Sequence, residues 1–204
     1  MAKHPFPDGE VDWSGDNPGI YLKDSADGPF RSLMVWFRIA LSAYGRGHVL
    51  VLFEDPTRAV GWPEAANFCI ADNEPLARHL VDNFCRKFGV FRDAKAFDAL
   101  QYLPLLEHSA FGDNLTSSGI AVTAPGLAIE LNWEKLGTPF AADVLPEQSA
   151  TGAHEMYSVF VESPEASIIV NGRRLKGDPF PRPFMGRTAS SAFLACSETW
   201  LKAS

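Results

Sequence analysis

Two of the five histidines stand beside acidic residues, and this pairing is the first feature of the chain that could carry out proton transfer. His108 follows Glu107 in the stretch LLEHSAFGD, which also contains Asp113, and His154 precedes Glu155 in GAHEMY. A histidine oriented by a carboxylate can act as a general base near neutral pH. We therefore take His108 and His154 as candidate bases if the fold brings the two segments together. The candidate orienting acids are Glu107, Asp113 and Glu155. Local hydrogen bonding at strand or loop ends is the alternative for each histidine.

Metal and cofactor chemistry have no motif in the chain. The histidines lack HxH and HExxH spacing, and the cysteines, Cys69, Cys85 and Cys196, are scattered without CxxC spacing. These patterns would otherwise place two ligands side by side on one metal. There is also no G-x-S-x-G nucleophile motif and no glycine-rich phosphate loop. We expect no metal, no cofactor and no covalent intermediate.

Arginines after a tight turn form the second candidate site. Asn171-Gly172 favours a two-residue hairpin, and Arg173 and Arg174 follow it directly, with Arg182 further on in GDPFPRPFMGR. The planar guanidinium group suits a carboxylate or phosphate. Successive strand residues point to opposite faces, so Arg173 and Arg174 cannot both face one ligand unless the strand bulges. Surface solubility is the alternative role.

Aromatic residues are abundant, with 15 Phe, 5 Trp and 4 Tyr. Most must lie in the core because they bury large areas. Trp13 and Trp133, however, fall in or beside expected loops, where rings often line a cleft or an interface. We take these two as candidate ligand-binding residues.

The composition limits the partners that the chain can have. Its 204 residues, 46% apolar and 21% charged, are typical of one globular domain, and we expect a single domain over 1–204. The net charge of −7 offers no field for a nucleic acid. No apolar run approaches the roughly 20 residues of a membrane helix, so we expect a soluble cytoplasmic protein with no membrane partner. The proline- and glycine-containing residues 1–18 predict an extended N-terminal arm or loop.

Local patterns predict several strands and hairpins and at least one helix. Strands are expected over 19–23, 48–55, 118–124, 127–133 and 154–163, and the capped apolar stripe of 73–89 predicts the clearest helix. Residues 31–44 fit a buried helix, which we favour, or a strand with alternating apolar residues. The tail, 188–204, predicts a closing helix because its Ala and Ser content disfavours a strand.

Together these patterns predict an α+β fold, a mostly antiparallel sheet with two or three helices packed on one face. We expect the protein to bind a partly apolar, anionic small molecule in a cavity between sheet and helices, anchored by Arg173, Arg174 or Arg182. One alternative is an enzyme that uses a histidine and a carboxylate as general acid and base. Another is a subunit of a homo-oligomer, such as a homodimer, whose aromatic residues cover a second copy.

Overall fold

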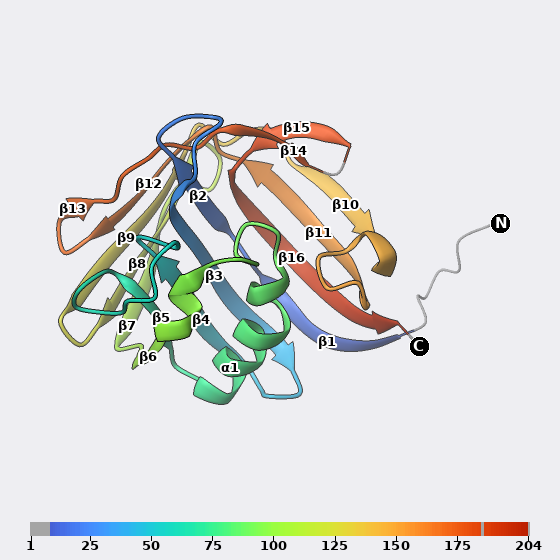
Figure 1. Ribbon diagram of the computed structural model, residues 1–204. Coiled ribbons are helices and arrows are strands. Elements are labelled where there is room, and N and C mark those ends of the chain that lie inside the picture. The colour runs from blue at the N-terminus through green and yellow to red at the C-terminus, as the bar shows by residue number, and fades with distance from the viewer. Residues whose placement is uncertain (1–8, 185, 204) are drawn as a thin grey trace.

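Sheets dominate the computed structural model, which describes residues 9–184 and 186–203. A large sheet lies in the middle, a smaller sheet packs on one of its faces, and helix α1 (Glu74–Asn83) covers the other (Figure 1). Two hydrophobic cores correspond to these two contacts, one between the helix and the large sheet and one between the sheets. No helix within the described ranges is both long and apolar enough to cross a bilayer.

The large sheet contains nine of the described strands, and all pairs except β5 (Asn67–Ala71) with β6 (Gln101–Pro104) are antiparallel. Strand β2 (Gly19–Lys23) pairs with both β16 (Ala192–Ala203) and β3 (Phe30–Ser42). The order across the sheet is β10 (Phe140–Val144), β11 (His154–Glu162), β16 (Ala192–Ala203), β1 (Gly9–Asp16), β3 (Phe30–Ser42), β4 (Gly47–Phe53), β5 (Asn67–Ala71) and β6 (Gln101–Pro104), with β2 at Gly19–Lys23.

The smaller sheet combines two hairpin segments that are separated in the chain by β10 and β11 of the large sheet. The turn after β12 (Glu165–Val170) has Asn171 and Gly172 at φ values of 50° and 76°, the left-handed conformations that a tight hairpin requires. The order is β13 (Arg173–Arg174), β12 (Glu165–Val170), β9 (Leu127–Glu134), β8 (Ser117–Ala124) and β7 (Glu107–Gly112). A separate two-stranded ribbon, β14 (Pro181–Phe184) and β15 (Arg187–Ser190), leads into β16.

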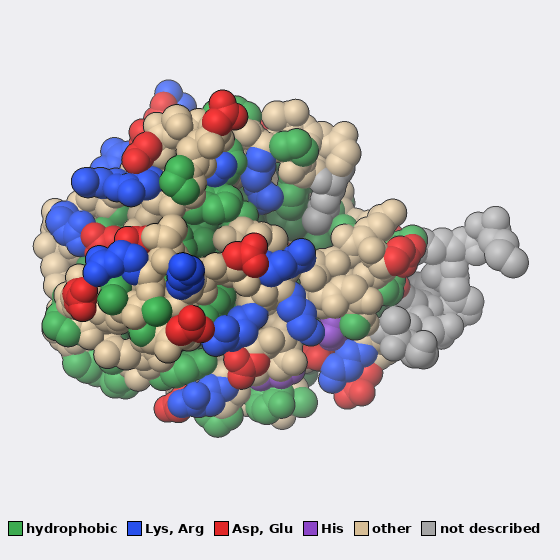
Figure 2. Space-filling model, in the orientation of Figure 1, with side chains coloured by type: hydrophobic (Ala, Val, Ile, Leu, Met, Phe, Trp, Pro, Cys, Tyr) green, Lys and Arg blue, Asp and Glu red, His purple; other side chains and the backbone are tan. Residues whose placement is uncertain are grey.

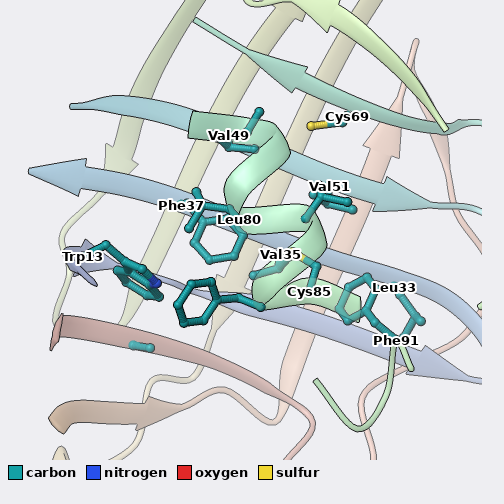
Figure 3. Packing of buried hydrophobic residues seen from close by; sticks show 14 of the residues in the cluster. Trp13, Leu33, Val35, Phe37, Val49, Val51, Cys69, Leu80, Cys85 and Phe91 are labelled. Atoms are coloured by element: carbon teal, nitrogen blue, oxygen red, sulfur yellow. The ribbon is translucent and has the colours of Figure 1, made fainter. Parts of the chain in front are cut away.

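Helix α1 is short and has an apolar inner face. The Asn73 side chain caps it by accepting a hydrogen bond from the Leu76 amide. The predicted helix over 73–89 is therefore present, but it ends at Asn83 and continues as a 3-10 turn, Cys85–Lys87. Leu80 and Cys85 lie over the strands of the large sheet (Figure 3). Two further 3-10 turns are Lys95–Ala99 and Pro146–Gln148.

The predicted α+β class is wrong, because the described residues contain one α-helix rather than two or three. The favoured helix over 31–44 is strand β3. Its odd-numbered apolar residues, such as Val35, face the helix, while Met34 and Trp36 face the smaller sheet. A strand buried on both faces has a continuous apolar sequence that periodicity cannot distinguish from a buried helix.

The two ends of the chain also differ from the sequence expectation. The predicted closing helix is strand β16, in which a bulge interrupts the alternation of buried residues. Residues 9–16, assigned to the expected arm, form strand β1, which pairs with β16 and β3. The rest of that arm before residue 9 lies outside the described residues. The two ends of the described chain thus lie next to each other in the large sheet (Figure 1).

Candidate functional site

A cavity of about 540 Å³ opens beside β16. Strands β2, β10, β11 and β16 contribute lining residues, as do β14 and two loops, 88–92 and 148–150. Ligand sites have volumes of roughly 300–1,000 Å³ and mostly apolar walls. In the space-filling view, apolar side chains are recessed between Lys and Arg side chains on this face (Figure 2). The aromatic lining residues are Tyr21, Phe88, Phe160, Phe184, Phe193 and Trp200.

A β-bulge in β16 turns Glu198 toward this cavity. On strand β16, Phe193 and Ala195 are buried, Ser197 is exposed, and then Glu198 and Trp200 are buried, so the alternation changes phase at Ser197. The pairing with β11 shows the reason, because Cys196 pairs with Val159 and Thr199 with Tyr157, leaving two residues of β16 opposite one of β11. Ser197 has a φ of 52°. A bulge of this kind re-aims a side chain and is common beside active sites.

The Glu198 carboxyl is buried and is held by two donors. Trp200 Nε1 donates to Oε1 at 2.6 Å and Asn17 Nδ2 donates to the same oxygen at 3.2 Å. Burial raises the pKa of Glu198 to about 7, against the lowering effect of these hydrogen bonds. The carboxyl therefore changes charge near neutral pH and can either donate or accept a proton there.

Arg182 lies at the cavity wall among aromatic rings. Its guanidinium carbon is 4.8 Å from the Phe184 ring centroid, 5.5 Å from Tyr21 and 5.8 Å from Phe193. Its Nε is buried without a hydrogen-bond partner, and burial lowers the pKa of the guanidinium group. Arg92 also lines the cavity, so two cations border it together with the aromatic rings.

Tyr21 is a further polar group at the cavity. It is 5% exposed, and burial raises the pKa of its hydroxyl well above the ordinary range. Its ring makes edge-to-face contacts with Phe91 and Phe193. The phenol is therefore neutral at physiological pH and can donate a hydrogen bond.

A second buried acid, Asp12, lies on the neighbouring strand and also occupies a bulge. Val11 pairs with Leu201 and Trp13 with Trp200, so Asp12 is an extra residue between the two pairs. Its Oδ1 is 2.6 Å from His79 Nε2. Its Oδ2 is 3.3 Å from His154 Nε2 and 3.2 Å from Lys202 Nζ.

These partners determine the charge of Asp12. Burial alone raises the pKa of Asp12, but the hydrogen bond and charge of His79 and the hydrogen bonds of Lys202 and His154 together outweigh burial and lower the pKa to about 2. Neither Asp12 nor His154 lines the cavity beside β16, whereas His79 borders a second, more open depression next to α1. The cluster ties α1 to strands β1, β11 and β16.

The structure separates the predicted ligand-binding residues. Trp13 is fully buried in the core against Phe37 and Phe84, and Trp133 is fully buried between the sheets with its Nε1 donating to the Gly19 carbonyl. Arg173 pairs with Glu54 at 2.7 Å and Arg174 with Asp178 at 2.9 Å, both on the surface. Of the five predicted residues, only Arg182 lines the cavity.

The predicted catalytic residues do not converge on one another. His154 lies beside Asp12 rather than beside the predicted acids, and its Nδ1 is 2.9 Å from Thr151 Oγ1. Glu155 accepts a hydrogen bond from Tyr157.

His108 contacts the His48 ring at 4.0 Å between centroids, on the exposed strand β7 that also carries Glu107. Asp113 accepts backbone hydrogen bonds from residues 115–117, which close the turn before β8.

Sequence reasoning missed Glu198, Asn17 and Tyr21. Glu198 lies within ACSETW, where a single acid resembles a solvated position on a helix. The one available signal was an isolated acid between apolar strand residues. The bulge at Ser197 concealed this signal, because a bulge breaks the two-residue alternation of a strand.

The comparisons with known proteins give no family for this chain. Within the described residues, no group of three or more His, Cys, Asp or Glu side chains is arranged to hold a metal ion. No protein-family model, no curated protein and no solved structure matches the sequence or the fold.

Proposed function

We propose that this protein binds a small, partly apolar, anionic molecule in the cavity beside β16, with Arg182 as its anchor. The observation that carries the proposal is a partly buried guanidinium group without an acidic partner among the described residues. A buried charge is costly unless it is paired, and an anionic ligand supplies the missing partner.

The other two candidate arginines provide the contrast. Arg173 and Arg174 have carboxylate partners and lie in solvent, so they have no need of a ligand. Arg182 instead lies against three aromatic rings, which support a cation but leave its hydrogen-bonding edge free for a carboxylate.

The aromatic lining supports an apolar body for the ligand. Rings from β2, β11, β14 and β16 border the cavity, together with Phe88 from the loop that follows α1. Burying an apolar body against them stabilises the complex by roughly 25 cal/mol for each Å² removed from water. The arginine then fixes the orientation of the ligand rather than supplying most of the affinity.

The proposal includes a cytoplasmic location. The three cysteines are free, and Cys69 and Cys85 are buried in the helix-side core. Free thiols are typical of a reducing compartment, where disulfides are rare.

Titration calorimetry with dodecanoic acid tests the proposal. We expect Arg182→Met, which keeps the length of the side chain but removes its charge, to weaken binding about 10- to 100-fold, the value of one charge-assisted contact. Arg174→Met is the matched control, because it removes a similar charge from the surface, and we expect unchanged affinity. Failure of the native protein to bind the acid, or equal affinity of the native protein and Arg182→Met, would overturn the proposal.

A further inference from the structure

Two polar groups of different chemistry line the cavity, Arg182 and Glu198. Arg182 contacts the rings of Tyr21 and Phe193, whereas Glu198 lies with Asn17 and Trp200. Phe193 and Glu198 are five positions apart on β16, which corresponds to roughly 15 Å along a strand. From this spacing we take the Arg182 side and the Glu198 side as the two ends that an elongated ligand would meet.

Hydrogen bonding around Glu198 leaves one oxygen for a ligand. Oε1 already accepts from Trp200 and Asn17, so the carboxyl group is fixed in orientation. In the neutral form, the proton belongs on Oε2, because Oε1 is occupied as an acceptor. The bulge at Ser197 is what places this carboxyl group on the cavity side of the sheet.

Two buried polar atoms near Glu198 lack a hydrogen-bond partner among the described residues. Asn17 Oδ1 and Ser158 Oγ are both buried without a hydrogen-bond partner of normal geometry, although Ser158 is near enough to influence the carboxyl group. Buried polar atoms without partners are uncommon in native structures and need an explanation. Asn17 lines the cavity beside Glu198, so a ligand group that donates a hydrogen bond at this end could also satisfy Asn17 Oδ1.

We propose that the ligand is a hydroxylated carboxylic acid, with its carboxylate at Arg182 and a hydroxyl at the far end of its apolar body on Glu198. The inference deepens, and rests on, the proposed binding of an anionic molecule in this cavity.

A hydroxyl fits this end better than other groups. It can donate and accept, so it forms a hydrogen bond with Glu198 whether the carboxyl group is neutral or ionised. A methyl end would offer no hydrogen bond to the second oxygen of Glu198, and a second carboxylate would repel the ionised form. Sites built to hydrogen-bond a hydroxyl discriminate strongly against the analogue that lacks it.

The experiment compares 12-hydroxydodecanoic acid with dodecanoic acid by calorimetry at one pH. We expect the native protein to bind the hydroxy acid about ten-fold more tightly, the value of one hydrogen bond to a buried carboxyl group. Glu198→Gln keeps a donor and an acceptor and should retain the preference. Glu198→Leu should lose it while still binding dodecanoic acid through Arg182.

A measurement on the native protein makes the test independent of how the variants fold. The indole N–H of Trp200 donates to Glu198, so its nitrogen-15 resonance reports on that carboxyl group. We expect the hydroxy acid to shift this resonance more than dodecanoic acid does.

The outcomes separate the two proposals. If neither acid binds, both the proposed function and this inference fail. If both acids bind equally well and shift Trp200 equally, the binding proposal stands and the hydroxyl inference is overturned. A preference for the hydroxy acid that persists in Glu198→Leu would also overturn it.

Discussion

Glu198 and Asp12 are two buried acids on paired strands, and they have opposite charge behaviour. Each is placed in the interior by a β-bulge, Glu198 in β16 and Asp12 in β1. Yet the pKa of Glu198 is raised to about 7, whereas that of Asp12 is lowered to about 2. Burial raises the pKa of both groups but encloses Glu198 more completely, and of the two only Asp12 has cationic partners among the described residues, so burial and partners together set the difference.

The partners also indicate different roles. Asp12 meets two imidazoles and an ammonium group, and its oxygens are occupied by the protein itself. Glu198 meets neutral donors, has no cation beside it among the described residues and borders a cavity. A buried acid that is paired with cations stabilises the fold. A buried acid without a cationic partner beside a cavity is a candidate binding group.

The largest expected effect comes from Asp12→Asn. Removing one member of a buried charged cluster should lower the free energy of unfolding by about 3 kcal/mol near neutral pH. Because the folded-state pKa of Asp12 is below the ordinary value of 3.8, this contribution is present above pH 3.8 and is lost as the pH falls toward about 2. Urea unfolding of the native protein and Asp12→Asn at several pH values measures this contribution to the free energy of unfolding.

Asp72→Asn is the control for Asp12. Asp72 contacts His48 Nδ1 at 2.8 Å, the same pair of groups, but on the surface. An exposed pair contributes less than about 1 kcal/mol. Equal decreases in the free energy of unfolding of Asp12→Asn and Asp72→Asn would contradict the role assigned to the Asp12 cluster.

Glu198→Gln should raise the free energy of unfolding, whereas Asp12→Asn should lower it. The folded protein holds the pKa of Glu198 near 7, above the ordinary 4.5, so the native protein loses stability as the pH rises through this interval. The glutamine variant lacks this loss and should be more stable by up to about 3 kcal/mol at pH 8, with the difference vanishing below pH 4.5. Unfolding of both proteins in urea across this pH range gives the comparison.

Glu130→Gln serves as the charge-matched control for Glu198, since it removes one exposed acid from the outer face of β9. We expect a change within about 0.5 kcal/mol at every pH. A native-like pH dependence in Glu198→Gln would show that this acid is not held neutral by burial.

The smallest effect is expected at Ser197, the exposed residue that forms the bulge. Its φ of 52° favours glycine, so Ser197→Gly should stabilise the protein by about 0.5–1 kcal/mol and Ser197→Val should destabilise it by about 1–2 kcal/mol. Thr188→Val, on the exposed strand β15, should change stability by less than about 0.5 kcal/mol. Thermal unfolding measures all three, and full tolerance of valine at Ser197 would contradict the need for a bulge.

Local signals in the sequence were reliable where short-range chemistry decides the structure. Asn171-Gly172 forms the expected hairpin, and Asn73 caps the expected helix. Patterns failed where long-range packing decides, because β3 is buried on both faces and the bulge in β16 breaks its alternation.

The candidate site could be predicted only in part for the same reason. Arg182 was recognisable as a candidate anchor, but the sequence could not separate it from Arg173 and Arg174, whose partners come from distant segments or the next turn. His154 was recognisable as a histidine that needs a carboxylate, yet its partner, Asp12, is 142 residues away in the chain. Contacts of this range depend on strand pairing, which one sequence does not display.

The most direct test of the account is a carbon-13 NMR titration of the two carboxyl groups, with and without dodecanoic acid. We predict that Glu198 titrates near pH 7 in the free protein and at higher pH once the acid fills the cavity, because water is displaced and a negative charge is added. Asp12 should titrate near 2 in both states. A Glu198 that titrates near 4.5, or that does not respond to the acid, would contradict the account.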